Sequence, residues 1–562
     1  MRARLFATLA VSVLAALLAI PSGTVSASSS GNAVVSSTGD IRFVANIPYP
    51  VGTDEEFATF NVTKLSNGAT GDPVCQTNPD GSCATDAAGK IVYQTEDRDF
   101  AFVGSESVNG FVIDITDPEN PVSVASLPCR ASQNDIQIWH NILLQSQDGT
   151  GGTCHKPSGG TQTQVTIGFS DISDPRNPRF LGKLTEARGA HNATVHPTQP
   201  IVYISNSDLP STSDVIHIWD FSNPAAPVKV KDWNPTSGSV FSPHDITFNA
   251  SGTRAYVASV DHTEILDSTD PKNPTLISTI YNEGVSISHQ SDPTPDGKFL
   301  LVSDELGGGG APTVSPGGSV HVYDIRNELR PVKVGLINED LTGAGHVSTA
   351  HVFRINPDGR TMAIAWYQDG VHVFDFSDIH GPNLYGSGNA TGVGARTIAS
   401  ILMQNANTWS AKMWQDRHPG YVFANDINRG FDVFYVPELG PGFLSTGTIH
   451  APIADGQAPS LTEIEFQTRC EYSPVSQGLD GYVFDLRGTG DGNHTNSVKG
   501  TSAAAHNLDL TFYDAACKLL TGKNLTAGND PSGTIPAGAK YAVADLVGGA
   551  QTRFVATTAV AA

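Results

Sequence analysis

One segment recurs six times in this chain and constrains its fold more than any other feature. Each copy has an apolar run that ends in Asp, a short polar loop, and a Pro seven positions after the Asp. The Asp residues are Asp114, Asp171, Asp220, Asp267, Asp324 and Asp375, and the matching prolines are Pro121, Pro178, Pro227, Pro274, Pro331 and Pro382. Because Asp accepts hydrogen bonds from backbone N–H groups in tight turns and Pro fixes φ, these residues are expected to be structural.

The stretch 351–382 shows the unit to which this segment belongs. β-Branched and aromatic residues form three short runs, and Gly, Pro, Asn and Asp stand between them, which predicts a meander of antiparallel strands. Another apolar run usually follows the Pro, so each unit has four strands. Four-stranded units without helical stretches between them predict a β-propeller. A solenoid is the competing architecture, but its repeats are normally shorter and more regular.

The number of blades follows from the innermost strand of each unit. Seven such strands are expected, and they begin near Ile91, Asn134, His191, His244, His289, His351 and Trp409. The last unit lacks the Asp-to-Pro loop, and two segments could supply its fourth strand, either 444–450 or the N-terminal 41–47. The predicted fold class is therefore all-β, with an about seven-bladed propeller over residues 40–455.

The repeat stops near Leu461, and the remaining residues 461–562 have a different pattern. Segments such as GYVFDLRG, HNLDLTFYDAACKLL and AKYAVADLVG alternate apolar and polar residues, with turn residues between them. A region of this size and pattern predicts a small β-sandwich.

The N-terminus has the features of a secretory signal peptide. A basic head precedes the apolar run Leu5–Ile20, and small residues follow, which predicts cleavage after Ala27 and a secreted, extracellular protein with no membrane span after removal of residues 1–27. The even cysteine count in such a protein favours disulfides. Proximity in the sequence suggests three pairs: Cys75 with Cys83, Cys129 with Cys154, and Cys470 with Cys517.

The formal net charge of -23 limits the classes of partner. Nucleic acids and anionic membranes require a basic face, so neither is expected as a partner. A small molecule or a cell-surface ligand remains as the expected partner class, and the sequence gives no indication of an oligomeric state.

Four histidines give the strongest functional signal. His191, His244, His289 and His351 open the innermost strands of four consecutive units, and Asn134 and Trp409 take this position in the neighbouring units. Because innermost strands line the axial channel of a propeller, the four imidazoles are expected to converge at one end. Neutral imidazole is a common ligand of transition metals, so the pattern predicts a site for copper, zinc or iron.

Further residues extend or weaken this prediction. Glu305 and His346 are secondary ligand candidates, and Asn192, Asp245 and Gln290 follow three of the histidines and are candidates to hydrogen-bond them. The alternative is that the histidines pack at blade junctions and hydrogen-bond to the neighbouring backbone. No nucleophile elbow, zincin motif or phosphate-binding loop occurs. Enzymatic activity is thus undecided, and a metal-dependent oxidoreductase is favoured over a hydrolase.

The repeated segments FVIDITDPENP and VIHIWDFSNPAAP resemble those of the LVIVD-repeat family of secreted propellers. Within that family the chain is most similar to the "choice-of-anchor B" group, on the residues His289-Gln290, Asp304-Glu305 and Asn428-Arg429-Gly430. The resemblance covers roughly residues 40–455 and implies an extracellular propeller without an established reaction. It departs from that group in having no recognisable C-terminal anchor. The segment NLDLTFYDA resembles accessory β-sandwich modules of secreted bacterial proteins. Two functions are therefore carried forward: a ligand- or metal-binding propeller with a histidine-lined channel, and a non-catalytic scaffold for extracellular proteins or glycans.

Overall fold

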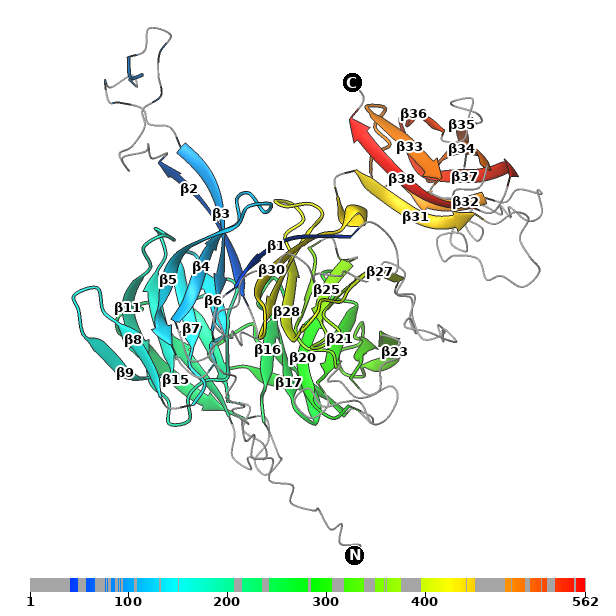
Figure 1. The fold of residues 1–562 in the computed structure, drawn as a ribbon. Coiled ribbons are helices and arrows are strands. Elements are labelled where there is room, and N and C mark those ends of the chain that lie inside the picture. Colours follow the sequence, from blue (N-terminus) through cyan, green and yellow to red (C-terminus); the bar gives the residue numbers. More distant parts are fainter. Residues whose placement is uncertain are drawn as a thin grey trace, which may run out of the picture.

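The computed structural model describes residues 41–48, 57–65, 76, 78, 82–85, 89, 91, 95–105, 109–130, 133–149, 151–206, 215–234, 242–281, 285–305, 318–337, 349–357, 359, 361–375, 396–440, 442–449, 481–486, 488–500, 506–516, 518–522, 531–549 and 552–560. Within these residues, strands dominate and the one helical element is the short 3-10 helix η1 (Pro437–Leu439). Seven sheets form a ring, and two further sheets form a second body near the C-terminus (Figure 1).

Each sheet of the ring is a blade of antiparallel strands. From the channel outward, blade 1 contains β2 (Ala58–Leu65), β3 (Thr95–Val103), β4 (Asn109–Asp114) and β5 (Val122–Arg130); blade 2 contains β6 (Ile136–Trp139), β7 (Ile142–Ser146), β10 (Ile167–Asp171) and β11 (Arg179–Leu184); blade 3 contains β12 (Asn192–Val195), β13 (Ile201–Ser205), β14 (Ile216–Asp220) and β15 (Val228–Trp233); blade 4 contains β16 (Asp245–Phe248), β17 (Arg254–Ser259), β18 (His262–Asp267) and β19 (Thr275–Tyr281). Blade 5 contains β20 (Ser288–Pro293), β21 (Phe299–Asp304), β22 (Val320–Asp324) and β23 (Val332–Ile337); blade 6 contains β24 (Phe353–Ile355), β25 (Thr361–Ala365), β26 (Val371–Asp375) and β27 (Arg396–Ile401); blade 7 contains β28 (Thr408–Met413), β29 (Tyr421–Asp426), β30 (Gly430–Tyr435) and β1 (Arg42–Ile47).

The N-terminal strand closes the ring. β1 pairs antiparallel with β30, with Arg42 opposite Tyr435 and Ile47 opposite Phe431. The alternative closing segment belongs elsewhere, because β31 (Phe443–Ile449) pairs with β38 (Thr552–Val560) of the C-terminal body. The expected propeller range of 40–455 therefore extends too far, and the second body begins with β31 rather than at residue 461.

The predicted position of the innermost strand of blade 1, near Ile91, was wrong. It is β2, which pairs with β3 from Ala58–Phe102 to Leu65–Thr95. Ile91 instead makes an isolated bridge to Thr85. The error arises because the segment between β2 and β3 is much longer than the loops between the corresponding strands of the other blades, so the spacing of the repeat is lost there.

The repeated Asp ends the third strand of its blade, as predicted, and binds the turn that follows. Oδ1 of Asp114, for example, accepts the backbone N–H of Thr116 at 3.1 Å, and Asp220 accepts that of Ser222 at 2.9 Å. In each of blades 1–6 the pairing of the third and fourth strands also shifts register shortly before the Asp. Such bulges increase twist and make an outer strand a poorer template for edge-to-edge pairing.

Ion pairs connect neighbouring blades on the face where these turns lie. Arg176 of blade 2 reaches Asp114 of blade 1 at 3.2 Å, and Lys272 of blade 4 reaches Asp220 of blade 3 at 2.7 Å. At the closure the polarity is reversed, because Glu119 of blade 1 accepts hydrogen bonds from Arg42 at 2.7 and 2.9 Å.

Apolar side chains fill the junctions between blades. Strand faces alternate in the expected way: Phe100 and Phe102 pack toward blade 2, whereas Ala101 and Val103 pack toward blade 7. Among the described residues a separate apolar cluster lies at each of the seven junctions. Because both faces of every blade are buried, the positions of the innermost strands are fixed by their neighbours on both sides.

A hairpin inserted in the sequence between two strands of blade 2 adds two strands to the sheet of blade 1. The hairpin of β8 (Gly152–His155) and β9 (Thr161–Val165) pairs with β5, and the predicted disulfide between Cys129 and Cys154 joins β5 to β8. Cys83 is also disulfide-bonded, but its predicted partner Cys75 lies outside the described residues, as do Cys470 and Cys517.

The C-terminal body is the predicted β-sandwich. One sheet contains β31, β38, β33 (His494–Gly500) and β36 (Ser532–Thr534), and the other contains β32 (Gly481–Asp485), β37 (Ala539–Gly549), β34 (His506–Asp514) and β35 (Leu519–Gly522). Buried apolar residues of both sheets form its core.

Segments relevant to the membrane lie partly outside the described residues. The predicted signal peptide 1–27 is among the residues not described. In the described part of the chain, no helix has the length and apolar character needed to cross a bilayer.

Candidate functional site

The four histidines form one continuous arc at an end of the channel. They begin the innermost strands of blades 3, 4, 5 and 6, and the ring centroids are 4.5 Å apart for His191 and His244, 4.3 Å for His244 and His289, and 4.1 Å for His289 and His351. Trp409 of blade 7 continues the arc, with its ring centroid 4.9 Å from that of His351. The repeat thus places one aromatic ring per blade over five blades.

Burial increases toward the middle of this arc. The side chains of His289 and His351 are 0% and 1% exposed, whereas that of His191 is 13% exposed. The Asp148 carboxylate lies 3.6 Å from Nδ1 of His191 at this more accessible end. The inner rings therefore have almost no contact with solvent, whereas the His191 end of the arc is more accessible.

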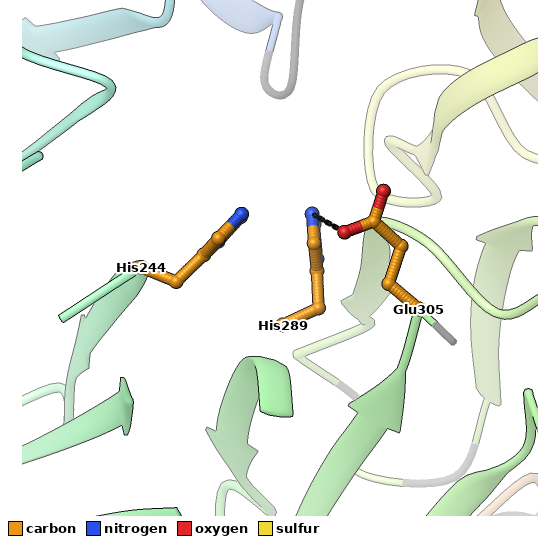
Figure 2. Close-up of side chains that lie close together, drawn as sticks. All are labelled: His244, His289 and Glu305. Atoms are coloured by element: carbon orange, nitrogen blue, oxygen red, sulfur yellow. Dashed lines mark ion pairs between the residues drawn. The ribbon is translucent and has the colours of Figure 1, made fainter. Parts of the chain in front are cut away.

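Glu305 supplies a carboxylate between two of the rings. It directly follows β21, and its oxygens lie 3.9 Å from Nε2 of His289 and 3.8 Å from Nε2 of His351. Figure 2 shows its side chain beside His289, with His244 on the other side of that ring. Ligand atoms of His244, His289 and Glu305 all lie within 4.8 Å of one another. This separation is somewhat larger than that of ligands on one bound ion, so small side-chain rotations would be needed to close the site.

A hydrogen bond to the next blade defines the role of His351. Its Nδ1 lies 2.6 Å from the carbonyl oxygen of Trp409, which can only accept, so Nδ1 carries the proton. Nε2, which faces Glu305, is then the nitrogen available for a metal ion. Metal-binding histidines commonly make this bond to a backbone carbonyl, which fixes the orientation of the ring.

Tyr367 also contacts Glu305. The sequence did not identify this residue. Its hydroxyl donates to Oε1 of Glu305 at 2.5 Å, and its ring packs on His351 with centroids 4.9 Å apart. Two backbone bonds to Thr408 hold Tyr367 at a φ of 47°, a left-handed conformation that non-glycine residues rarely adopt. Its place just after a second strand, as for Glu305, is a signal that could have identified it.

The residues expected to hydrogen-bond the histidines also connect neighbouring blades. Nδ2 of Asn192 donates to Asp245 at 2.8 Å, and the Gln290 amide exchanges two hydrogen bonds with the backbone of Phe353 in the next blade. That the three side chains orient the histidines stays a prediction. His346, the other secondary candidate, lies outside the described residues.

A second group of similar composition lies between the outer strands of blade 3 and the segment that follows β11 of blade 2. His217 Nδ1 is 2.6 Å from Asp232 and 3.7 Å from Glu186. Here the ammonium group of Lys229 lies 3.0 Å from Glu186 and 2.8 Å from Asp232. The lysine occupies the place of a cation and neutralises the carboxylates, so this group is a polar network rather than a metal site.

A third group, in blade 4, consists of a histidine enclosed by two carboxylates. His262 hydrogen-bonds to Asp261 and Glu264, and Ser259 donates to Glu264 at 2.7 Å. Burial disfavours the charged ring, but the two carboxylates outweigh this effect and raise the pKa of His262 to about 9. By contrast, burial lowers the pKa of His321, on β22, to about 3.

Comparisons with known proteins add little to this picture. No protein-family model and no curated protein matches the sequence. Among solved structures, the β-propeller domain of Cps50 (Swd1) from Myceliophteria thermophila is 11% identical, with a TM-score of 0.44 over 71% of this chain and 99% of that one. Hydrazine synthase of Kuenenia stuttgartiensis is 12% identical, with a TM-score of 0.43 over 59% of this chain and 91% of that one. A hypothetical selenium-binding protein of Sulfolobus tokodaii is 15% identical, with a TM-score of 0.37 over 54% of this chain and 77% of that one. At such values the architecture rests on the strand pairings of this chain itself.

Proposed function

We propose that the protein is a secreted propeller of the LVIVD-repeat type that binds a transition-metal ion at the histidine-lined end of its channel. His244, His289 and Glu305 are the proposed ligands, and His351 is a further one. The observation that carries the proposal is that the ligand atoms of His244, His289 and Glu305, from two adjacent blades, all lie within 4.8 Å of one another.

The chemistry of the surroundings supports a metal ion of intermediate softness. Imidazole nitrogens with one carboxylate suit zinc, copper and iron. No lysine or arginine is paired with Glu305 in the described part of the chain, in contrast to Glu186. The rings are buried and close together, so one ion could be reached by ligand atoms of several of them.

Elemental analysis of protein purified from culture medium without chelators tests the proposal. We expect a near-stoichiometric amount of zinc, copper or iron in the parent and its loss in the variant His244→Ala/His289→Ala. His217→Gln is the matched control, because it removes a buried histidine beside carboxylates that are already neutralised. Absence of metal from the parent, even after reloading with zinc, copper and iron salts, would refute the metal site.

The second candidate function is an extracellular interaction scaffold. The separate C-terminal sandwich favours it, because such a body adds surface without contributing to the described histidine arc. Loss of binding to a cell-surface fraction after deletion of the sandwich, with an unchanged metal content, would assign that role to the sandwich alone.

A further inference from the structure

At two blade junctions the repeated Asp binds a cation that comes from the turn of the next blade. Oδ2 of Asp114 lies 3.2 Å from Nη2 of Arg176, and Oδ2 of Asp220 lies 2.7 Å from Nζ of Lys272. Both cationic residues stand five positions after the Asp of their own blade. In blade 5 this fifth position is Leu329. The junction of blades 4 and 5 therefore lacks the cation that the other two junctions have.

The backbone places Leu329 where Lys272 lies in the preceding blade. In both turns the residue after this position donates its N–H to the carbonyl oxygen three positions earlier. These bonds run from Asn273 to Asp270 and from Arg330 to Asn327, both at 2.9 Å. Leu329 is 71% exposed. An apolar side chain is thus presented to solvent at a position that carries a cation in two other blades.

Asp267 of blade 4 is the acceptor that such a cation would have reached. Its Oδ1 accepts the backbone N–H of Thr269 at 3.0 Å, as in the other turns. The hydroxyl and the N–H of Thr269 hold the pKa of Asp267 below its ordinary value, so the group is a carboxylate at neutral pH. Nη1 of Arg254 lies 3.7 Å from Oδ2, which is beyond hydrogen-bond distance. Nε of Arg254 is directed instead to Glu328, at 2.8 and 3.0 Å.

The remaining repeated Asp residues of blades 1–5 bind a cation from their own blade. Asp171 is paired with Arg179, and Asp324 is paired with Arg326. Within the described part of these five blades, Asp267 is therefore the exception, with no cation at hydrogen-bond distance from Oδ2. Its side chain is 42% exposed, so a ligand from solvent can reach it.

A groove of about 520 Å³ lies between these turns of blades 4 and 5. Asp267 lines it together with the apolar side chains of Leu329 and Ile277 and the ion pair of Arg254 and Glu328. Because Arg254 and Glu328 neutralise each other, Asp267 remains as the carboxylate without a close counter-ion. A carboxylate beside apolar side chains fits an ammonium group on an apolar stem, as in lysine.

We propose that this groove binds a lysine side chain of a partner polypeptide, with its ammonium group at Oδ2 of Asp267 and its methylene groups along Leu329. The chain itself contains the precedent, because Lys272 reaches Asp220 in this way from a neighbouring turn. The net charge of -23 makes two copies of the chain repel each other, so the partner is a different and more basic protein.

The groove and the histidine arc lie at opposite ends of blade 4. Asp267 is paired with Arg254 at the first residue of β17, whereas the N–H of His244 donates to the carbonyl oxygen of Ala258 near the last residue of that strand. The inference therefore goes beyond the proposed metal site and does not depend on it.

The test uses NMR of the full chain with labelled isoleucine methyl groups, because Ile277 lines the groove and reports its occupation. The probes are two tripeptides with blocked ends, Gly-Lys-Gly and the same peptide with an acetylated lysine, which has no charge. We expect the lysine peptide to shift the Ile277 signal and to bind about threefold more tightly than the acetylated one, the effect of a partly exposed ion pair.

Two variants remove the site in different ways. Asp267→Asn keeps the oxygen that binds the turn and loses the charge, so the affinity for the lysine peptide should fall about threefold. Leu329→Lys supplies the cation that the other junctions have, at an exposed position that does not endanger folding, and should lower the affinity by at least the same factor. Asp171→Asn is the matched control, because it removes the same charge from an equivalent turn whose Oδ2 is already paired with Arg179. Its affinity should equal that of the parent.

Equal affinities of the parent for the two peptides would overturn the inference, as would an unchanged affinity in Leu329→Lys. Tighter binding of pentylamine than of the lysine peptide would overturn the assignment to a polypeptide and indicate a small amine. The metal content of the same protein samples tests the proposed function separately, because neither variant alters the channel end.

Discussion

Two regions of the propeller combine histidine with carboxylate, and they differ in what balances the charge. At the channel end, Glu305 lies among His289, His351 and the hydroxyl of Tyr367, with no ammonium or guanidinium paired to it in the described structure. On the outer strands of blade 3, Lys229 is paired with both carboxylates that surround His217. The two regions therefore contain similar residue types but differ in whether a protein cation is paired with their carboxylates. This difference is the reason for proposing a metal ion at the channel end and not beside His217.

The largest effect is expected from Tyr367, which distinguishes the channel site most clearly. Tyr367→Phe removes the hydroxyl that donates to Glu305 and leaves the ring against His351. Metal affinity should fall about 10–100-fold, as for other partners of metal ligands, measured by competition with a chelator. Tyr203→Phe removes a similarly buried bond, from Tyr203 to the carbonyl of Pro271, and should leave the affinity unchanged. Equal affinities of Tyr367→Phe and the parent would show that Glu305 is not a ligand.

A smaller effect is expected from His262, whose carboxylates bind a proton instead of a metal ion. The pKa of this ring is raised from its ordinary 6.5 to about 9, so the folded protein holds the proton more tightly than the unfolded chain. This contribution to stability is complete below pH 6.5 and is lost as the pH rises through about 9. The difference between 6.5 and about 9 corresponds to at most about 3 kcal/mol. Because Asp261 is 63% exposed and solvent screens its charge, the parent should lose about 2 kcal/mol of unfolding free energy over this range relative to His262→Gln, measured by urea denaturation. A pH-independent difference between the two proteins would mean that His262 is neutral when folded.

The smallest effect is expected from Lys229. It tests whether this lysine alone prevents metal binding beside His217. Lys229→Met leaves Glu186, Asp232 and His217 without their cation, which should destabilise the protein by about 1 kcal/mol because the group is partly exposed. Zinc should then raise the Tm of the variant but not that of Lys229→Arg, which keeps the positive charge. Chelator-treated protein in which the proposed channel ligands His244 and His289 are also replaced isolates this effect. If zinc raises neither Tm, the lysine is not what prevents metal binding there.

The sequence predicted the parts of this structure that repeat locally. The Asp-to-Pro spacing identified the third and fourth strands of six blades, and the shared position of the four histidines predicted their convergence. The sequence did not decide which segment closes the ring, because the pairing of Arg42 with Tyr435 depends on the fold of all the residues between them. Tyr367 and Lys229 were missed for the same physical reason: each reaches its carboxylate across a strand or a blade, and such contacts leave no periodic signal in the sequence.

The closure by β1 also has a consequence for the order of folding. During synthesis β1 emerges before any complete blade, whereas its partner β30 lies almost four hundred residues later. β1 therefore stays without its final neighbour until β30 has been synthesised. Pairing across so long a separation in the sequence makes the last step of folding slow. Until that step, β1 and β30 both have unpaired edges, which can add to the strands of another copy. A chain shortened by residues 42–47 would keep the β30 edge permanently, and strand exchange between molecules would replace the closure within one.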